Sequence, residues 1–432
     1  MARLRDILRG GAWLTPGRIR LVATLLFVAS AAGLVYLVVT ANGLIDAQGR
    51  PLGTDFSNVY AAGTYVLDGD PEAPFDPSRQ HAREQDIFGK ATPFYGWHYP
   101  PFFLFVAAIL AWLPYGLALA LWQAATLGLY LMTIRAILPT PLRNRWIASP
   151  DWLLPALAFP AVLINIGHGQ NGFLTAALLG TALVKLNRAP ILAGILFGLL
   201  AYKPQFGLLI PVALAASGRW RAFAAAAATV GALAVATTFA FGPQVWQAFL
   251  DSTRFTREVA LEQGDTGWYK IQSVFAWVRM WGGSIALAYA LQGALIGALA
   301  GALIWLWRSA APYPVKAAAL CLAAILATPY SFDYDMMVLA PAIAFLAANG
   351  LKRGFDPWEK TALAGLWLAP LVARSVAHMT LIPFGVPAML AMFILLLRRS
   401  TKDLAATIAF SDPPITITRS TLRGHDIAVF KP

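Results

Sequence analysis

Residues 21–41 are LVATLLFVASAAGLVYLVVTA, an apolar run long enough to cross a bilayer as one helix. Similar runs recur at 116–132, 221–241, 284–307 and 361–376. Only 12% of the 432 residues are charged, against about 25% in ordinary soluble domains. The runs lack the two-residue alternation of a membrane barrel. We therefore predict an all-α polytopic membrane protein with roughly 10–13 transmembrane helices.

Lysine and arginine residues predict how the chain is oriented. The formal net charge is +12, but the basic residues are scattered between the apolar runs instead of forming one face, which argues against a nucleic-acid partner. Arginines at positions 3, 5, 9, 18 and 20 predict that residues 1–20 are a cytoplasmic N-terminus. The first run exceeds the apolar core of a secretory signal, which favours an uncleaved span over a signal peptide.

The later basic clusters predict the remaining boundaries. Residues 21–399 form the membrane domain, with a first external loop at 42–98 and a second at 242–272, and residues 400–432 form a cytoplasmic tail. The stretch 99–137 is ambiguous. It holds either one crossing and a tilted or re-entrant piece, or two crossings.

Polar side chains near the ends of apolar runs are candidates for function, because such groups are costly at membrane depth. With the orientation above, one set of candidates falls at the outer ends of spans: Asp55, His98, His168, Gln170, Asn171, Lys203, Asp333, Asp335 and His378. Their grouping on one side predicts a single site at the outer face.

Asp55 lies just after the first span, in the segment TDFSNVYAAG (Thr54–Gly63). One interpretation is a helix cap, in which Thr54 or Asp55 starts an interfacial helix. The other is a general base that accepts a proton from an acceptor hydroxyl.

Two further outer segments are GWHYPPFF (Gly96–Phe103) and INIGHGQNG (164–172). The aromatic residues of the first, Tyr99 among them, fit an interfacial belt, and His98 either orients a ligand or faces water. In the second, glycines permit close backbone approach, and the side chains beside them offer hydrogen bonds to a hydroxyl-rich ligand. A plain polar turn is the alternative for this segment.

The remaining candidates are charged. Lys203 lies between apolar stretches and must snorkel, pair with an acid or meet an anion such as phosphate. Asp333 and Asp335 are interpreted as helix caps, as a partner for Lys203 or as ligands of sugar hydroxyls. Arg374 and His378 are four residues apart and share one helix face.

Together these segments resemble the multi-pass GT-C glycosyltransferases, and specifically the polyprenyl-phosphate-mannose-dependent α-mannosyltransferases of glycosyltransferase family 87. The resemblance covers roughly residues 21–399 and rests on an ordered set of short motifs: Asp55-Phe56 with Tyr60-Ala61-Ala62, Tyr99-Pro100-Pro101, Gly169-Gln170-Asn171, Ala193-Gly194 to Lys203-Pro204-Gln205, and Thr328-Pro329-Tyr330 with Tyr334-Asp335. The chain has Tyr330 where some relatives have histidine.

The resemblance implies an inverting transfer of a sugar, mannose by default, from a polyprenyl-phosphate donor to a glycolipid or glycan acceptor. Asp55 is then the catalytic base. Lys203, Arg374 and His378 bind the donor phosphate, and the sugar and acceptor are bound by the other candidates: His98, Tyr99, His168, Gln170, Asn171, Tyr330 and Asp335. No cofactor and no metal are expected. The implied location is the bacterial cytoplasmic membrane, with the site on the periplasmic or extracellular face.

Two other classes of protein remain open. A secondary transporter or lipid flippase also carries polar groups in a bundle of helices, although transporters usually place them near the midplane and often show repeated halves. A noncatalytic membrane scaffold leaves the outward grouping of Asp55, Lys203 and Asp335 unexplained. The oligomeric state is not predicted.

Overall fold

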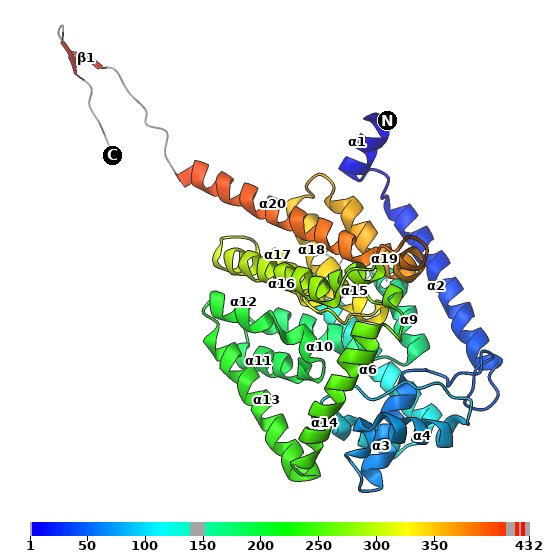
Figure 1. Cartoon of the computed structure of the whole chain (residues 1–432). Coiled ribbons are helices and arrows are strands. Elements are labelled where there is room, and N and C mark those ends of the chain that lie inside the picture. Colours follow the sequence, from blue (N-terminus) through cyan, green and yellow to red (C-terminus); the bar gives the residue numbers. More distant parts are fainter. Residues whose placement is uncertain (1, 139–151, 412–419, 423–424, 428–432) are drawn as a thin grey trace.

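The computed structural model describes residues 2–138, 152–411, 420–422 and 425–427, and its regular structure is almost entirely helical (Figure 1). In the described part of the chain, six segments are long and apolar enough to span a membrane: α2 (Pro16–Val39), α6 (Tyr115–Ile137), α13 (Trp220–Phe241), α16 (Ile285–Arg308), the 3₁₀ turn η7 (Asp333–Val338) with α18 (Leu339–Arg353), and α19 (Glu359–Thr380). The all-α membrane fold is thereby confirmed.

Shorter apolar helices lie between these spans: η2 (Pro101–Phe103) with α5 (Leu104–Ala111), α10 (Gly172–Lys185), α11 (Pro190–Leu199) with η3 (Leu200–Tyr202), η4 (Pro204–Gly207) with α12 (Ile210–Ala216), and α17 (Tyr313–Leu326). The last long helix is α20 (Gly385–Ser411). The total number of crossings stays a prediction.

The other elements are mostly short: α1 (Ala2–Gly10), α3 (Phe56–Leu67), η1 (Ala73–Phe75), α4 (Pro77–Phe88), α8 (Leu153–Leu157), α9 (Pro160–His168), α14 (Gln244–Phe255), the π-helix η5 (Thr256–Gln263), η6 (Trp268–Lys270) and α15 (Val274–Met280). Two strands, β1 (Ser420–Leu422) and β2 (His425–Ile427), pair antiparallel in the tail.

The ambiguous stretch 99–137 contains one long helix, α6, and a short helix, α5, that does not cross. The Tyr60 hydroxyl of α3 donates to the Leu113 carbonyl just after α5, at 2.9 Å. The Tyr115 hydroxyl at the start of α6 donates to the Leu52 carbonyl, at 2.5 Å. Both contacts tie the turn between α5 and α6 to residues of the 42–98 segment, which favours one crossing with a tilted or re-entrant piece.

The bundle has two ends, joined by α2, whose 24 residues span about 36 Å. At the N-terminal end, the Trp358 amide donates to the Arg9 carbonyl at 2.7 Å. At the other end, called the loop end here, the Asp55 amide donates to the His168 carbonyl at 3.0 Å. Figure 1 shows α1 and α20 together at one end and α3 and α4 at the other. The segments predicted to face outward lie at the loop end.

The core lies around α17, in which every residue from Ala317 to Leu326 is almost fully buried. Helices α10, α18 and α20 contact it. By contrast, α2 exposes large apolar side chains such as Leu25, Val28 and Val39. An apolar helix with an exposed apolar surface is suited to lipid, which agrees with the predicted first span.

Candidate active site at the loop end

Asp55 occupies the N-cap position of α3, but its carboxylate makes no capping hydrogen bond within the described chain. Instead, Oδ2 accepts a hydrogen bond from Nε2 of Gln170 at 2.9 Å. The Thr54 hydroxyl lies 3.4 Å from Oδ1, and the Asp55 side chain stays 20% exposed. The carboxylate is therefore held by the Gln170 amide and, at longer distance, by the Thr54 hydroxyl, and it remains accessible to a ligand.

The turn 169–171 brings Gln170 to Asp55. It follows α9, whose C-cap residue, Gly169, has a left-handed φ of 63°. A Cβ on Gly169 would lie 2.5 Å from the Cβ of Phe56, so only glycine allows this approach to α3. The sequence pattern predicted close backbone approach here, and the structure shows why it is needed.

A chain of hydrogen bonds continues from this turn into the bundle. Nδ2 of Asn171 donates to the Tyr99 hydroxyl at 2.8 Å, and the Tyr202 hydroxyl donates to the Asn171 carbonyl at 3.1 Å. The hydroxyls of Thr175 and Tyr202 lie 2.5 Å apart. These groups are buried, so they fix the turn.

His168 lies beside Asp55 at the end of α9. Its Nδ1 is 2.7 Å from the Thr54 hydroxyl and 3.9 Å from Oδ1 of Asp55. Its ring also meets the Tyr334 ring edge-on, with centroids 6.2 Å apart. The His168 side chain is 28% exposed, so the ring, like the carboxylate beside it, is partly accessible.

Lys203 and Asp335 form a buried ion pair, with Nζ and Oδ1 2.6 Å apart. Both side chains are less than 10% exposed. Oδ2 of Asp335 accepts the Phe332 amide at 3.0 Å, and the ammonium lies over the Tyr334 ring at 5.2 Å. A phosphate at Lys203 would have to join or displace this ion pair, and a sugar at Asp335 would meet a carboxylate that is already bonded.

Arg374 pairs with Asp333, with Nη2 3.0 and 2.8 Å from its two carboxylate oxygens. Asp333 is buried, whereas the Arg374 side chain is 37% exposed. Lys270 lies in the same region and makes no ion pair with a described residue. The pKa of Lys270 is lowered by burial and then by the positive charges of Arg374 and Arg50. Positive charges gathered around a partly buried lysine favour an anion between them.

The second loop positions Lys270. The ring of Tyr269 packs edge-on against His378 of α19, with centroids 5.0 Å apart. Farther along the loop, the Thr256 hydroxyl lies 2.9 Å from Nδ1 of His98. The segment therefore covers the loop end from α19 to the aromatic segment before α5.

Tyr330 lies at the loop end, just before η7. Its ring packs edge-on against Phe332, with centroids 4.9 Å apart, and its amide donates to the Thr328 hydroxyl at 3.2 Å. The structure thus brings Asp55, His168 and Gln170 into one group and Arg374, His378 and Lys270 into another. His98, Tyr99, Asn171, Tyr330 and the Lys203–Asp335 pair lie around these groups in contacts of their own.

Glu84 of α4 orients the aromatic segment that ends in Tyr99. Its side chain is fully buried, and its two oxygens accept the Tyr95 amide at 3.0 Å and the Gly96 amide at 3.3 Å. Nε2 of Gln80 lies 3.2 Å from the same carboxyl. Burial raises the pKa of Glu84 to about 7, outweighing these hydrogen bonds, which lower it.

We expect this carboxyl to make stability depend on pH. Because its folded pKa lies above the ordinary value of 4.5, its contribution to stability is full below pH 4.5 and is lost as the pH rises through about 7. The loss is on the order of 3 kcal/mol. Thermal unfolding of the protein in detergent should therefore show a fall in Tm between pH 5 and 8 that is shallower in Glu84→Gln. Parallel curves for the two proteins would contradict this role.

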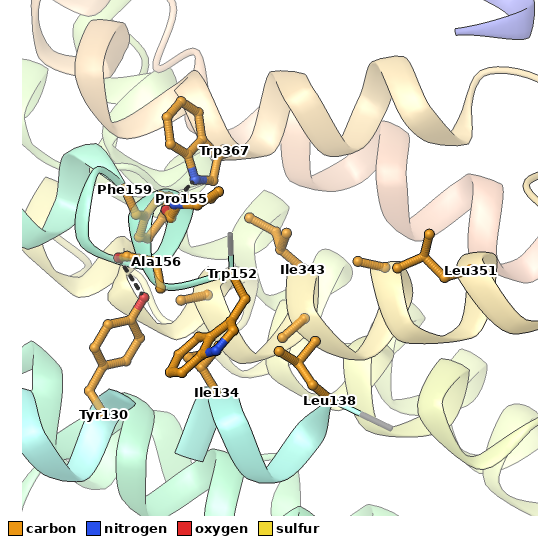
Figure 2. Close-up of a pocket in the computed structure, with 13 residues that line it drawn as sticks. Tyr130, Ile134, Leu138, Trp152, Pro155, Ala156, Phe159, Ile343, Leu351 and Trp367 are labelled. Atoms are coloured by element: carbon orange, nitrogen blue, oxygen red, sulfur yellow. Dashed lines mark hydrogen bonds between the residues drawn. The ribbon is translucent and has the colours of Figure 1, made fainter. Parts of the chain in front are cut away.

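An apolar pocket of about 180 Å³ lies elsewhere in the bundle (Figure 2). Its walls include Leu138 after α6 and Leu351 of α18, which are the ends of those helices farther from the loop end. Figure 2 shows the Tyr130 hydroxyl bonded to the Ala156 carbonyl, at 3.0 Å. Its lining holds no carboxylate, histidine, lysine or arginine among the described residues, so it is not suited to acid–base chemistry.

The described side chains form no obvious metal-binding site. Among the described residues, no group of three or more histidine, cysteine, aspartate and glutamate side chains is placed to hold an ion. The prediction of a metal-independent site stays untested.

Several groups at the loop end were missed by the sequence interpretation. Asn165 donates to the Tyr334 carbonyl at 2.9 Å and accepts the Gly172 amide at 2.8 Å, which ties α9 to α10 and η7. An amide within the apolar run of α9 was the available signal. Lys270 and Glu84 gave no such signal, because charged residues are ordinary in loops.

Comparison with family models identifies the family of the chain. The model of glycosyltransferase family 87 matches residues 97–329, more than half of the chain. The matched range includes His98, Gln170 and Lys203 but ends before Asp335 and begins after Asp55. Comparison with curated proteins and with solved structures finds no match. The chain belongs to glycosyltransferase family 87, a family of GT-C type membrane glycosyltransferases.

Proposed function

We propose that this glycosyltransferase moves a sugar, with mannose as the family default, from a polyprenyl-phosphate donor to a hydroxyl of a glycolipid or glycan acceptor. The proposal rests on the position and contacts of the Asp55 carboxylate. Its carboxylate lies at a helix start without capping it, is oriented by Gln170, and is partly exposed. A carboxylate held this way is available as a general base.

In the proposed step, the acceptor oxygen attacks the anomeric carbon while Asp55 takes the proton of the acceptor hydroxyl. The new bond joins the anomeric carbon to the acceptor oxygen, and the bond between that carbon and the phosphate oxygen breaks. The electron pair leaves with the lipid phosphate. Attack opposite to the leaving group inverts the anomeric centre, and Asp55 later returns its proton to water.

We assign the leaving phosphate to the side of the site where Arg374 and Lys270 lie. Lys270 is a cation whose pKa is lowered by burial and by its positive neighbours, and it has no ion-pair partner among the described residues. An anion there relieves the repulsion and stabilises charge as it develops in the transition state. Lys203 stays a candidate for the phosphate, but its ion pair with Asp335 favours a role in holding the site together.

The sugar is then placed between the two groups of residues. Gln170 and His168 border Asp55, and their side chains can hydrogen-bond to hydroxyl groups. The ring of Tyr334 contacts both His168 and Lys203 and links the Asp55 group to the buried ion pair. His98, Tyr99, Asn171 and Tyr330 are proposed to support the acceptor or the sugar.

Replacing Lys270 by glutamine is expected to weaken use of the donor. Hydrogen bonds to charged groups contribute roughly 1.5–3 kcal/mol, so the KM for the lipid donor should rise about tenfold or more. The measurement is the donor KM from initial transfer rates. Lys90→Gln is the matched control, because Lys90 is an exposed lysine that pairs with Asp86 in the first loop. An unchanged donor KM in Lys270→Gln would remove Lys270 from the phosphate site.

The positive-inside pattern supports placing the loop end outside a bacterial cytoplasmic membrane. Arginines cluster before α2, and residues beyond the other end of α2 include the acids Asp46, Asp68 and Asp70. A polyprenyl donor in the outer leaflet would then reach the site from the bilayer. The acceptor is proposed to come from the same face.

A transporter or flippase is the alternative, and proteoliposomes distinguish it. Purified protein is reconstituted with a radiolabelled polyprenyl-phosphate sugar and a membrane lipid extract. The proposed function predicts a new labelled glycoside that forms with time. Movement of the labelled lipid across the bilayer without any new glycoside would instead support the flippase.

A further inference from the structure

Besides the apolar pocket, a polar pocket of about 400 Å³ lies at the N-terminal end of the bundle. Its size falls within the roughly 300–1,000 Å³ of small-molecule sites. It is formed by α1, by the turn between α18 and α19, and by α20, and its basic lining residues are Arg5, Arg9, Arg398 and Lys402. The chain of α2 separates it from Asp55, so it belongs to no part of the site described above.

The contacts of α1 hold this pocket in shape. The Arg9 carbonyl accepts the Trp358 amide at 2.7 Å, and the Leu8 carbonyl accepts the Thr361 hydroxyl at 2.6 Å. Two carbonyls at the end of α1 therefore have partners on the first turn of α19. Trp358 adopts a left-handed φ of 75°, which is strained for a bulky residue. Such strain persists where surrounding contacts fix the backbone. Trp358 lines the pocket, so the backbone is fixed at this wall.

The two acidic side chains in the lining are already paired. Oε2 of Glu359 lies 2.6 Å from Nη1 of Arg399, and both side chains are buried. Oδ2 of Asp356 lies 3.3 Å from Nζ of Lys402. Three lining arginines, Arg5, Arg9 and Arg398, remain without a carboxylate partner among the described residues. The pocket therefore carries an excess of positive charge and suits a phosphate group.

The surroundings favour a phosphate that belongs to a lipid. Helix α1 leaves its apolar side chains uncovered, with Leu4 62% and Ile7 38% exposed, while arginines alternate with them along the helix. Such a helix lies in the headgroup region of a membrane with its apolar side chains in the acyl boundary. Anionic headgroups attract basic residues at this level. A phosphate in the pocket would thus be delivered by the bilayer itself.

We propose that this pocket binds the phosphate of an anionic phospholipid headgroup, in the leaflet opposite to the one that Asp55 faces. The arginines of α1 and α20 hold the phosphate between them. The bound lipid thereby joins the N-terminal helix to the last long helix. The site is separate from sugar transfer and does not depend on the proposed donor or acceptor.

The test is native mass spectrometry of the full chain in detergent with added dioleoylphosphatidylglycerol. The variant carries Arg5→Gln, Arg9→Gln and Arg398→Gln. Its control carries Lys185→Gln, Arg188→Gln and Arg221→Gln, which removes the same charge from basic residues outside the pocket. We expect the pocket variant to bind the anionic lipid at least tenfold more weakly than the wild type, and the control to stay within about twofold. If both variants bind the lipid equally weakly, the loss comes from the lower overall charge, and the proposed site in the pocket is wrong.

Two further arms complete the test. A third variant with Arg5→Lys, Arg9→Lys and Arg398→Lys keeps the charge and should bind the lipid as the wild type does; loss of binding in a protein of wild-type elution volume would contradict a charge-based site. Inorganic phosphate is titrated into protein that already holds the lipid and should displace it only weakly. Competition as strong as that of the lipid would overturn the assignment to a lipid headgroup.

Discussion

The Asp55→Asn variant should lose transfer activity by a factor of about 10² to 10⁴, which is the contribution expected of a general base. The amide has the shape of the carboxylate but cannot take a proton. Its oxygen can still accept the hydrogen bond from Gln170, so the turn at 169–171 keeps its place. The loss should therefore appear in kcat, with the donor KM little changed. Initial rates measured across donor concentrations separate the two.

The matched control is Asp86→Asn, since Asp86 lies in the same loop and its side chain is 62% exposed in a pair with Lys90. This variant should transfer sugar at the wild-type rate. An Asp55→Asn protein as active as the wild type would remove Asp55 from the mechanism. A loss confined to KM would make Asp55 a binding residue.

Replacing Lys203 by methionine should have the largest effect on stability. The change leaves the buried carboxylate of Asp335 without its cation, and breaking a buried pair in this way costs about 3–5 kcal/mol. The double variant Lys203→Met, Asp335→Leu should recover part of this loss, because two apolar side chains replace two buried charges. Recovery is incomplete, since the Phe332 amide also loses its acceptor.

Thermal unfolding in detergent measures both variants. Lys90→Met serves as the control, because an exposed pair such as Lys90 and Asp86 contributes only about 0–1 kcal/mol. A Lys203→Met protein as stable as the wild type would show that the ion pair does not hold the site. A double variant no more stable than the single one would show that the cost comes from lost packing.

Much of the fold could be predicted from the sequence. Long apolar runs predicted the membrane helices, and the basic residues between them predicted which segments share an end of the bundle. The stretch 99–137 could not be resolved this way, because the apolar sequence of α5 suits a span as well as a helix packed on α3. The hydrogen bonds from Tyr60 to Leu113 and from Tyr115 to Leu52 favour the packed helix, and neither can be read from the sequence.

The candidate site was predictable in its parts but not in its pairings. Asp55 stood out as a helix start, yet sequence cannot tell whether a carboxylate caps the helix or turns to Gln170. For Lys203 the alternatives included an acid partner, and the structure supplies Asp335. Lys270 and Arg374 lie far apart in sequence. Their proximity depends on how the second loop folds over α19, which no local pattern encodes.

We propose that a lipid phosphate, and not a nucleotide, carries the sugar. The most direct test incubates purified protein and a membrane lipid extract with radiolabelled polyprenyl-phosphate mannose, and in parallel with the corresponding labelled nucleotide sugar. We predict labelled glycoside from the lipid donor alone, and its loss with Asp55→Asn. Label transferred from the nucleotide sugar and not from the lipid donor would contradict the account.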